Sequence, residues 1–441
     1  MRGRVFFWSL TSALAGFLFG FDTVVISGAE QRIQALWQLT PGMHGFAIAS
    51  ALYGTVLGSI LGGVPTDRFG RKPTLFGIGV LYVVAALGSA LASDVQQFIV
   101  ARFIGGLGIG ISTVVAPLYI SEIAPAKHRG LLAGMFQFNI VFGIVVAYLS
   151  NSLLSGTGPD AWRWMLGVAA APSILYAGLC LGLPESPRWL LGRRHDHAAG
   201  EAVLRLIEPA ATPAEITAAA TAIAGAAATR AGGGPFWTRS LRLPISLAIL
   251  IAVFNQMSGI NAILYFAPRI FELAGLGRSA AMLQSVGIGI TNLLVTFAGL
   301  WLIDRLGRRT LLFIGSYGYI VSLGLVAWGF FSGRVGIVPL CIFAFIAAHA
   351  IGQGTVIWVY IAEIFPNRQR AEGQALGSST HWICAALLTT LFPQMVSVFA
   401  PGYVFLFFCG MMVLQLAWVR LMVVETKGMP LEEVQRRLGV G

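Results

Sequence analysis

The sequence predicts an all-α polytopic membrane protein, with 12 transmembrane helices in two six-helix halves and short cytoplasmic linker helices between them. Three observations predict this fold: an apolar composition, twelve long apolar stretches, and motifs that recur in both halves. Of the 441 residues, 56% are hydrophobic and only 11% are charged. A soluble domain carries roughly 25% charged residues, so the composition indicates a chain that crosses a lipid bilayer many times.

An apolar stretch of about 20 residues is long enough to cross the ~30 Å hydrocarbon core of a bilayer as a helix. Six such spans precede a polar gap and six follow it. The expected spans cover residues 6–28, 46–66, 74–92, 98–121, 131–152, 164–183, 243–271, 281–304, 310–331, 336–362, 373–396 and 401–424. The first 15 residues alone resemble a cleaved signal peptide, but the apolar run continues to residue 28, which favours a first transmembrane span.

The spans divide the chain into four expected parts. Residues 1–183 form the N-terminal six-helix half, 184–242 a cytoplasmic linker, 243–424 the C-terminal six-helix half and 425–441 a cytoplasmic tail. Within the linker, Thr212, Pro213 and Glu215 fit an N-terminal capping box, which predicts a short helix. The glycines at 232–234, followed by proline, should end the linker helices.

The net charge of +11 could suggest a nucleic-acid partner, but the placement of the basic residues argues against it. Of the 29 Lys and Arg residues, 23 fall at the termini and in alternate loops, on one side of the predicted membrane. By the positive-inside rule that side is cytoplasmic, and both termini lie there. We expect a monomeric, multi-pass plasma-membrane protein, most simply of a bacterial inner membrane, with the lipid bilayer and no nucleic acid as partner.

The sequence lacks the motifs of cofactor and metal chemistry. The stretch GGLGIG at 105–110 lies inside an apolar span with no strand before it, so it indicates close helix packing and not a dinucleotide site. None of the three lysines belongs to a Walker motif, and no HExxH motif occurs. The four cysteines lie singly within spans, which indicates packing. We therefore expect no cofactor, no metal and no enzyme activity.

Two motifs occur once in each half. DRFGRKPTL at 67–75 reappears as DRLGRRTLL at 304–312, and PLYISEIAPAKHRG at 117–130 is matched by WVYIAEIFPNRQRAEG at 358–373. Such parallel repeats are the plan of major facilitator transporters. The alternative is that these charges only set the topology, which would need neither the Asp nor the Gly. We expect a cytoplasmic gate, closed in one state and open in the other, made by Asp67, Arg68, Arg71, Glu122, Arg129, Asp304, Arg305, Arg308, Glu363 and Arg370.

Side-chain amides and aromatic rings occur where a membrane span should be aliphatic. Amides both donate and accept hydrogen bonds, and an aromatic ring can pack on the C–H face of a sugar ring, so the set suits a monosaccharide. For any single amide, hydrogen bonding between helices is the alternative. The set comprises Gln137, Asn255, Gln256, Asn261, Tyr265, Asn292, Trp358 and Trp382.

Asp22 interrupts the first span, within the stretch GFDTVVISG. A carboxylate in the bilayer is costly unless it is paired or protonated, and such residues mark ion paths by default. Arg102, near the start of the fourth span, is the one cation within a span of the same half. Burial favours the neutral carboxyl group and the guanidinium favours the ionised one, so the pair could bind and release a proton. A permanent salt bridge is the structural alternative.

The order of the motifs resembles the sugar porters of the major facilitator superfamily over nearly the whole chain. The matching stretches are GFDTVVISG, DRFGRK, RFIGGLGIG, PLYISEIAP, PESPRWL, QMSGINAILYF, DRLGRR, AEIFP and ETKGMPLEE. The resemblance implies that Gln137, Gln256, Asn261, Asn292, Trp358 and Trp382 occupy sugar-binding positions. Two positions depart from the family: Asn255 replaces a usual second Gln, and His381 replaces a more familiar Asn or Gln. An Asp at position 22 is typical of the proton symporters.

We therefore expect a secondary active transporter that carries a monosaccharide, a hexose or a pentose, into the cell with a proton by alternating access. The N-terminal half would hold the proton-coupling pair and the C-terminal half most of the sugar contacts. The nearest alternative is a facilitative uniporter or exchanger on the same fold. A transporter-like sugar sensor usually has a long signalling tail, and a membrane enzyme would need a nucleophile or metal constellation.

Overall fold

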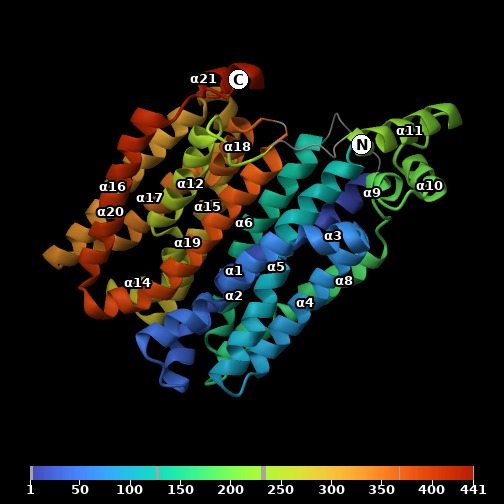
Figure 1. Cartoon of the computed structure of the whole chain (residues 1–441). Helices are drawn as coiled ribbons and strands as arrows, with labels where there is room; N and C mark the ends of the chain where they lie inside the picture. The colour runs from blue at the N-terminus through green and yellow to red at the C-terminus, as the bar shows by residue number, and fades with distance from the viewer. Residues whose placement is uncertain (1–2, 126–128, 230–234, 367, 441) are drawn as a thin grey trace. The chain divides into compact units, whose positions relative to one another are not determined.

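A computed structural model describes residues 3–125, 129–229, 235–366 and 368–440, without the side chains of 129–131, 133, 226–229, 431 and 432. Within these ranges the elements are all helices (Figure 1). Twelve helical segments are long and apolar enough to cross a membrane. The all-α class and the expected number of spans are thereby confirmed for the described part of the chain.

Some helices have the length of a membrane span, and other expected spans are divided into two or more shorter helices. The first group is α1 (Gly3–Leu36), α2 (Pro41–Leu61), α3 (Gly63–Phe69), α4 (Arg71–Leu91), α5 (Val95–Ile123), α6 (Arg129–Leu154), α7 (Ala161–Gly167) and α8 (Ala170–Leu181). The linker holds α9 (Pro187–Gly192), α10 (His197–Ile207) and α11 (Pro213–Thr229). The last group is α12 (Arg242–Met257), α13 (Ile260–Tyr265), α14 (Ala267–Leu273), α15 (Arg278–Leu306), α16 (Arg308–Ser332), η2 (Val335–Ile337), α17 (Val338–Ile351), α18 (Gln353–Ile364), α19 (Arg370–Val398), α20 (Pro401–Met422) and α21 (Leu431–Arg437).

The expected seventh span is broken into α12, α13 and α14. Gly259 has a φ of +86° between α12 and α13, a conformation that glycine adopts without strain. A Cβ at this position would lie 2.7 Å from the ring of Phe408, so glycine is also needed for packing. The break turns the segment that carries Asn261 and Tyr265, and Pro268 then lies in the first turn of α14.

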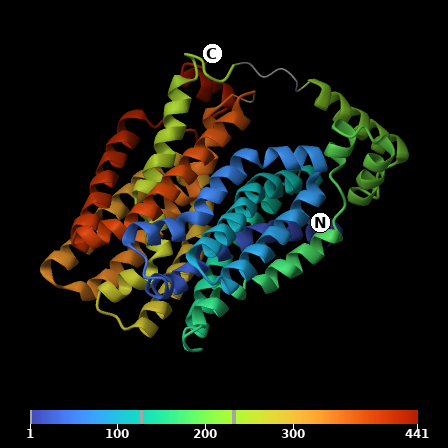
Figure 2. The same ribbon diagram turned by 60° about the horizontal axis from the view of Figure 1, so that its bottom comes forward.

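The linker helices form as the capping signal predicts. The Thr212 hydroxyl accepts a hydrogen bond from the Glu215 backbone N–H at 3.3 Å, and the Glu215 carboxylate accepts one from the Thr212 N–H at 2.7 Å. Helices α9, α10 and α11 pack against one another, drawn in green in Figure 2. The predicted stop at the glycine run lies outside the described residues.

The described chain forms two compact units that do not follow the middle of the sequence. The first unit comprises Met1–Asp22, Gly54–Ile144 and Leu166–Gly233, and the second comprises Thr23–Tyr53, Val145–Met165 and Gly234–Gly441. The C-terminal part of α1, the N-terminal part of α2 and the end of α6 thus pack with helices of the second half of the sequence. The four-part division expected from sequence remains a prediction.

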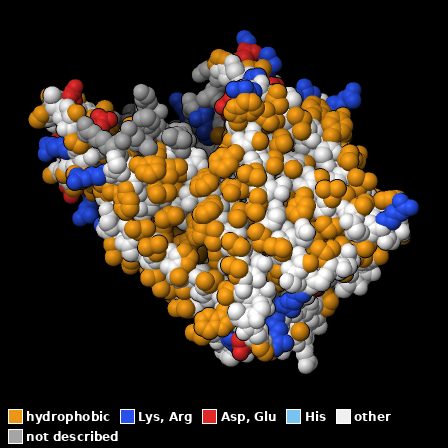
Figure 3. All heavy atoms as spheres, turned by 180° about the vertical axis from the view of Figure 1, so that it is seen from behind, with side chains coloured by type: hydrophobic (Ala, Val, Ile, Leu, Met, Phe, Trp, Pro, Cys, Tyr) orange, Lys and Arg blue, Asp and Glu red, His pale blue; other side chains and the backbone are white. Residues whose placement is uncertain are grey.

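Each unit is a bundle of apolar helices. In the first unit α4 packs against α5 and α8, and in the second unit α16 runs beside α20 (Figure 1). Hydrophobic side chains cover most of the face shown in Figure 3, and charged side chains lie mainly toward its margins. Exposed apolar residues such as Leu153, Leu294 and Leu421 match helices that face lipid hydrocarbon.

Candidate functional site: a buried amide cluster, a buried ion pair and two arginine clusters

Gln256 is the centre of a hydrogen-bonded cluster at the α12–α13 break in the second unit. Its amide Nε2 donates to Oδ1 of Asn255 at 3.0 Å and lies 3.2 Å from Nε2 of His381. Its Oε1 accepts a hydrogen bond from Nδ2 of Asn261 at 2.9 Å. Gln256 is fully buried and both ends of its amide have partners, so its orientation is set by the protein.

His381 lies between two of the predicted tryptophans. Its ring centroid is 5.1 Å from that of Trp358 and 4.8 Å from that of Trp382, with the latter pair nearly perpendicular. The amide Nε2 of Gln256 lies 3.3 Å from Nδ1 and 3.2 Å from Nε2 of His381, so both ring nitrogens face it. An amide N–H can only donate, so one of these two nitrogens accepts and carries no hydrogen. Trp358 and His381 are half-buried, which leaves part of both rings accessible.

The remaining predicted sugar residues are found on α13, α15 and α6. Tyr265 is buried on α13, and Asn292 on α15 accepts a hydrogen bond from the Thr296 hydroxyl at 3.4 Å. Gln137 lies half-buried on α6 in the first unit. The structure therefore brings Asn255, Gln256 and Asn261 together with His381 and the tryptophans. Both residues that depart from the family pattern, Asn255 and His381, hydrogen-bond to Gln256.

Asp22 and Arg102 form the ion pair that the sequence predicts. Nη1 of Arg102 donates to Oδ1 of Asp22 at 2.6 Å, and Nη2 donates to the backbone oxygen of Asp22 at 3.1 Å. Both residues are buried in the first unit. Among the described residues, Oδ2 of Asp22 and Nε of Arg102 have no hydrogen-bond partner. The hydrogen-bonding capacity of the pair is thus only partly satisfied among the described residues.

The first copy of the repeated motif forms an arginine cluster in the first unit. Arg71 donates from Nε and Nη2 to the two carboxylate oxygens of Glu122, each at 2.9 Å. Its Nη1 lies 3.2 Å from the Thr66 backbone oxygen and 3.4 Å from Oδ1 of Asp67. This two-bond geometry between a guanidinium and a carboxylate is the strong form of the ion pair.

The second copy repeats the arrangement in the second unit. Arg308 donates from Nε and Nη2 to the Glu363 carboxylate at 3.0 and 2.7 Å, and from Nη1 to the Ile303 backbone oxygen and to Asp304, both at 3.1 Å. Glu122 and Glu363, two acids of the expected gate, therefore each bind an arginine of the repeated motif. The internal repeat seen in sequence is also a repeat of side-chain geometry.

The other predicted gate residues lie apart from these clusters. Arg68 and Arg305 are exposed and lie over the rings of Phe69 and Trp301. Arg370 donates to the backbone oxygen of Ala362 at 2.8 Å. Arg129 begins α6, and its side chain lies outside the described part.

Comparisons with known proteins identify the family of the chain. The family model described as "Sugar (and other) transporter" matches residues 8–438. The chain belongs to this sugar transporter family. The arabinose-proton symporter of Bacillus subtilis is 33% identical, with 98% of this chain and 95% of the relative covered. The galactose-proton symporter of Escherichia coli K12 is 34% identical, with 100% and 96% covered.

A solved structure shares the fold of this family member. It is described as a partially occluded inward open conformation of the xylose transporter XylE from Escherichia coli. The TM-score is 0.86 at 30% identity, with 97% of this chain and 100% of that chain covered. The major facilitator fold expected from the motifs is confirmed.

Two acidic residues complete the arginine clusters and were missed by the sequence analysis. Glu185 accepts hydrogen bonds from the backbone N–H groups of Arg71 and Lys72, at 2.8 and 3.2 Å. Glu425 accepts them from Arg308 and Arg309, at 2.9 and 3.0 Å. Each carboxylate thus caps the N-terminus of the helix that follows the motif. Their positions in the sequence could have revealed them: Glu185 in PESPRWL and Glu425 in ETKGMPLEE each come directly after the last span of their half.

Glu185 and Glu425 also explain why the repeated motif has a glycine after its first arginine, at positions 70 and 307. Gly70 and Gly307 have φ values of +100° and +93°. A Cβ at either position would collide with the carboxylate of Glu185 or Glu425. The motif therefore needs glycine both for its backbone conformation and for the space that the acid occupies. Burial raises the pKa of Glu185 above its ordinary value, against the backbone hydrogen bonds that favour the ionised form.

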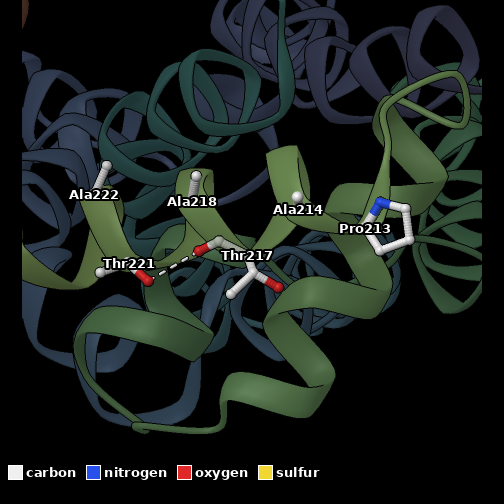
Figure 4. A pocket seen from close by; sticks show the side chains of 6 residues that line it. All are labelled: Pro213, Ala214, Thr217, Ala218, Thr221 and Ala222. Carbon is white, nitrogen blue, oxygen red and sulfur yellow. Dashed lines mark hydrogen bonds between the residues drawn. The ribbon is translucent and has the colours of Figure 1, made fainter.

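A hollow on the linker helix α11 is unrelated to the amide cluster. It is lined by Pro213, Ala214, Thr217, Ala218, Thr221 and Ala222, and Figure 4 shows these short side chains along α11. The only hydrogen bond drawn there runs from the Thr221 hydroxyl to the Thr217 backbone oxygen at 2.9 Å. No charged or amide side chain lines it, so it offers little to recognise a sugar.

Proposed function

We propose that this member of the sugar transporter family carries a monosaccharide, a hexose or a pentose, into the cell together with a proton. The observation that carries the proposal is the buried Asp22–Arg102 pair with its unpaired carboxylate oxygen. The relatives named as proton symporters support it. They do not decide the sugar, because arabinose is a pentose and galactose a hexose.

The proton would bind at Oδ2 of Asp22. An O–H bond forms there, the carboxylate loses its charge, and Arg102 remains a cation whose partner has become neutral. The electrostatic part of the 2.6 Å contact is then lost, which allows α1 and α5 to separate. Each charge moved across 100 mV supplies ~2.3 kcal/mol, enough for about a fiftyfold concentration ratio.

The sugar would bind beside the amide cluster. Gln256 has its polar atoms engaged, so we assign it to holding His381 and Asn261 in place. The direct hydrogen bonds to hydroxyl groups would come from Asn261, Asn292 and the ring nitrogen of His381 that does not accept from Gln256. Trp358 would pack on the C–H face of the sugar ring. Gln137 and Tyr265 are proposed as further contacts.

Alternating access would use the two arginine clusters as a cytoplasmic gate. Each cluster holds the start of one helix, α4 or α16, against an acid at the end of another span. We propose that both termini are cytoplasmic and that the protein resides in a bacterial inner membrane, as its basic loops indicate.

The test is transport by the purified protein in liposomes. A panel of hexoses, pentoses and polyols is offered against one labelled sugar, while the external pH is recorded. Sugar uptake with alkalinisation of the medium is the expected result. Uptake without a pH change would indicate a uniporter or exchanger, and binding without any flux would indicate a sensor.

A further inference from the structure

A second buried ionic cluster lies in the second unit, apart from the amide cluster and from the Asp22 pair. Glu30 on α1 and His44 on α2 are both fully buried. Arg269 on α14 donates from Nε to Oε1 of Glu30 at 2.9 Å and from Nη2 to Oε2 at 2.8 Å. The Nε2 of His44 lies 2.7 Å from the same Oε2. Nη2 of Arg269 also donates to the side-chain oxygen of Gln34 at 2.5 Å.

The charges of this cluster balance. The Glu30 carboxylate accepts from His44, so Nε2 of His44 carries the hydrogen. Its Nδ1 is buried and has no hydrogen-bond partner in the part of the chain that the structure describes. A hydrogen on Nδ1 would be a buried N–H group without an acceptor among the described residues, which favours the tautomer with its hydrogen on Nε2. One guanidinium then faces one carboxylate, with His44 and Gln34 filling the remaining hydrogen bonds.

The cluster lies at the opposite end of the second unit from the Arg308 cluster. Helix α14 ends just before α15, which runs for 29 residues to the gate motif, roughly 40 Å at 1.5 Å per residue. Two further hydrogen bonds in this unit join α2 to α19 and α6 to α13. They connect Tyr53 with Thr390 at 2.9 Å and Tyr148 with the Leu264 backbone oxygen at 2.6 Å. Segments of the first six spans are thus fastened to the broken seventh span and its neighbours.

We propose that Glu30, His44 and Arg269 form an outer latch that holds α14 on the ends of α1 and α2, and that the latch must open before sugar can enter from outside. The inference rests on the proposed sugar transport. Alternating access moves one half of the transporter against the other, and the latch joins a helix of the second half to two helices of the first. Its opening exposes both charges to water, which offsets part of the lost attraction. The latch therefore changes the ratio of the outward-closed to the outward-open state, and it does not hold the transporter permanently in either state.

The latch is also connected to the proposed sugar site through the backbone of α13 and α14. Arg269 follows Asn261 by eight residues, and only the short break at Phe266 separates α13 from α14. The Phe266 ring packs against His44 with centroids 6.1 Å apart. A movement of Asn261 or Tyr265 on a bound sugar would therefore reach the latch through one short helix. Glu30, His44 and Arg269 act as positioning residues in this scheme and do not touch the sugar.

The test compares Glu30→Gln and Arg269→Gln with the control Arg278→Gln, an exposed arginine at the start of α15. Sugar KM is measured separately for sugar added outside and inside vesicles of known orientation. A weaker latch raises the fraction of the outward-open state, and the apparent affinity follows that fraction. We expect the outside KM to fall at least threefold, the inside KM to rise or stay constant, and the control to behave as the unmodified protein.

A second readout needs no sugar. Leu264→Cys places a thiol on buried α13, and its labelling by a membrane-impermeant thiol reagent from outside reports opening at this end. Adding Glu30→Gln should speed the labelling at least threefold, and Arg269→Lys, which keeps the charge but loses the two-bond geometry, should give a smaller increase.

Unchanged labelling, or equal KM changes on both sides, would overturn the latch. Misfolding of all three latch variants would also overturn it and leave a purely structural ion pair. Absence of sugar flux in the unmodified protein would instead overturn the proposed function.

Discussion

Arg102 binds Asp22 twice, once at the carboxylate oxygen Oδ1 and once at the backbone oxygen, and leaves Oδ2 unpaired among the described residues. The backbone contact does not depend on the charge of the carboxyl group. Protonation at Oδ2 would therefore weaken the interaction without abolishing it. This distinguishes the pair from the Arg71–Glu122 pair, in which both carboxylate oxygens bind the guanidinium.

Replacing Asp22→Asn should separate binding from coupling. The amide imitates the protonated carboxyl group in size and charge, and it leaves the amide cluster untouched. Sugar binding and exchange of labelled for unlabelled sugar should persist, whereas accumulation driven by a proton gradient should be lost. The measurement is accumulation and equilibrium binding on the same preparation, with Asp160→Asn as a control at an exposed site. Joint loss of folding and binding, as after removal of one partner of a buried ion pair at a cost of ~3–5 kcal/mol, would favour a structural bridge.

Replacing Trp358→Ala should weaken sugar binding at least roughly tenfold, because the half-buried ring offers both a stacking face and an indole N–H. Calorimetric titration with the transported sugar measures the change. Trp328→Ala is the matched control, since Trp328 is 46% exposed on α16. If both variants bind as the unmodified protein does, Trp358 is not the sugar platform.

Replacing Asn255→Gln should change the preference among sugars. Asn255 accepts a hydrogen bond from Gln256, so an arm longer by one methylene group shifts Gln256 and, through it, His381. The ranking of competing sugars in the uptake panel should change more than the thermal stability. A uniform loss for every sugar, with a stability loss of ~1–3 kcal/mol, would indicate overpacking at this buried position.

Replacing Arg308→Lys should impair transport through the gate. Lysine keeps the charge but cannot make two parallel hydrogen bonds to Glu363. We expect a lower rate of net uptake at nearly unchanged sugar affinity. Arg305→Lys is the control in the same motif, because Arg305 is exposed and lies over Trp301. Equal rates for the two variants would remove Arg308 from the gate.

Replacing Glu185→Gln should flatten the pH dependence of stability. Burial raises the pKa of Glu185 in the folded protein above its ordinary value of 4.5. The folded state then binds more protons than the unfolded state just above that pH, so the free energy of unfolding falls as pH rises through this window. Thermal unfolding from pH 4.5 upward should show a smaller decline in the variant. Glu208→Gln, at an exposed linker position, should keep the slope of the unmodified protein, and an unchanged slope in Glu185→Gln would contradict the prediction.

The class of the protein, its spans, its internal repeat and three of its charged pairs could be predicted from the sequence alone. A membrane span is a local property, since it depends on the transfer of about 20 consecutive side chains into hydrocarbon. The pair Asp22–Arg102, and the participation of Glu122 and Glu363 in ion pairs with the repeated motif, were predictable for a related reason. Few charges occur within or beside apolar spans, so each has few possible partners.

The partners of residues that are far apart in the sequence and carry no distinctive local motif became known only from the folded structure. Glu30 and Arg269 are separated by 239 positions, and nothing in either local stretch points to the other. The hydrogen bonds of Asn255 and His381 with Gln256 were likewise not foreseeable from their local sequences. Nor was the position of the Glu185 carboxylate beside Gly70. Hydrogen bonds form over about 3 Å, so the choice of partner depends on how distant helices pack. Because of that packing, the C-terminal part of α1, the N-terminal part of α2 and the end of α6 belong to the second unit. The internal repeat alone would have placed them with the N-terminal half.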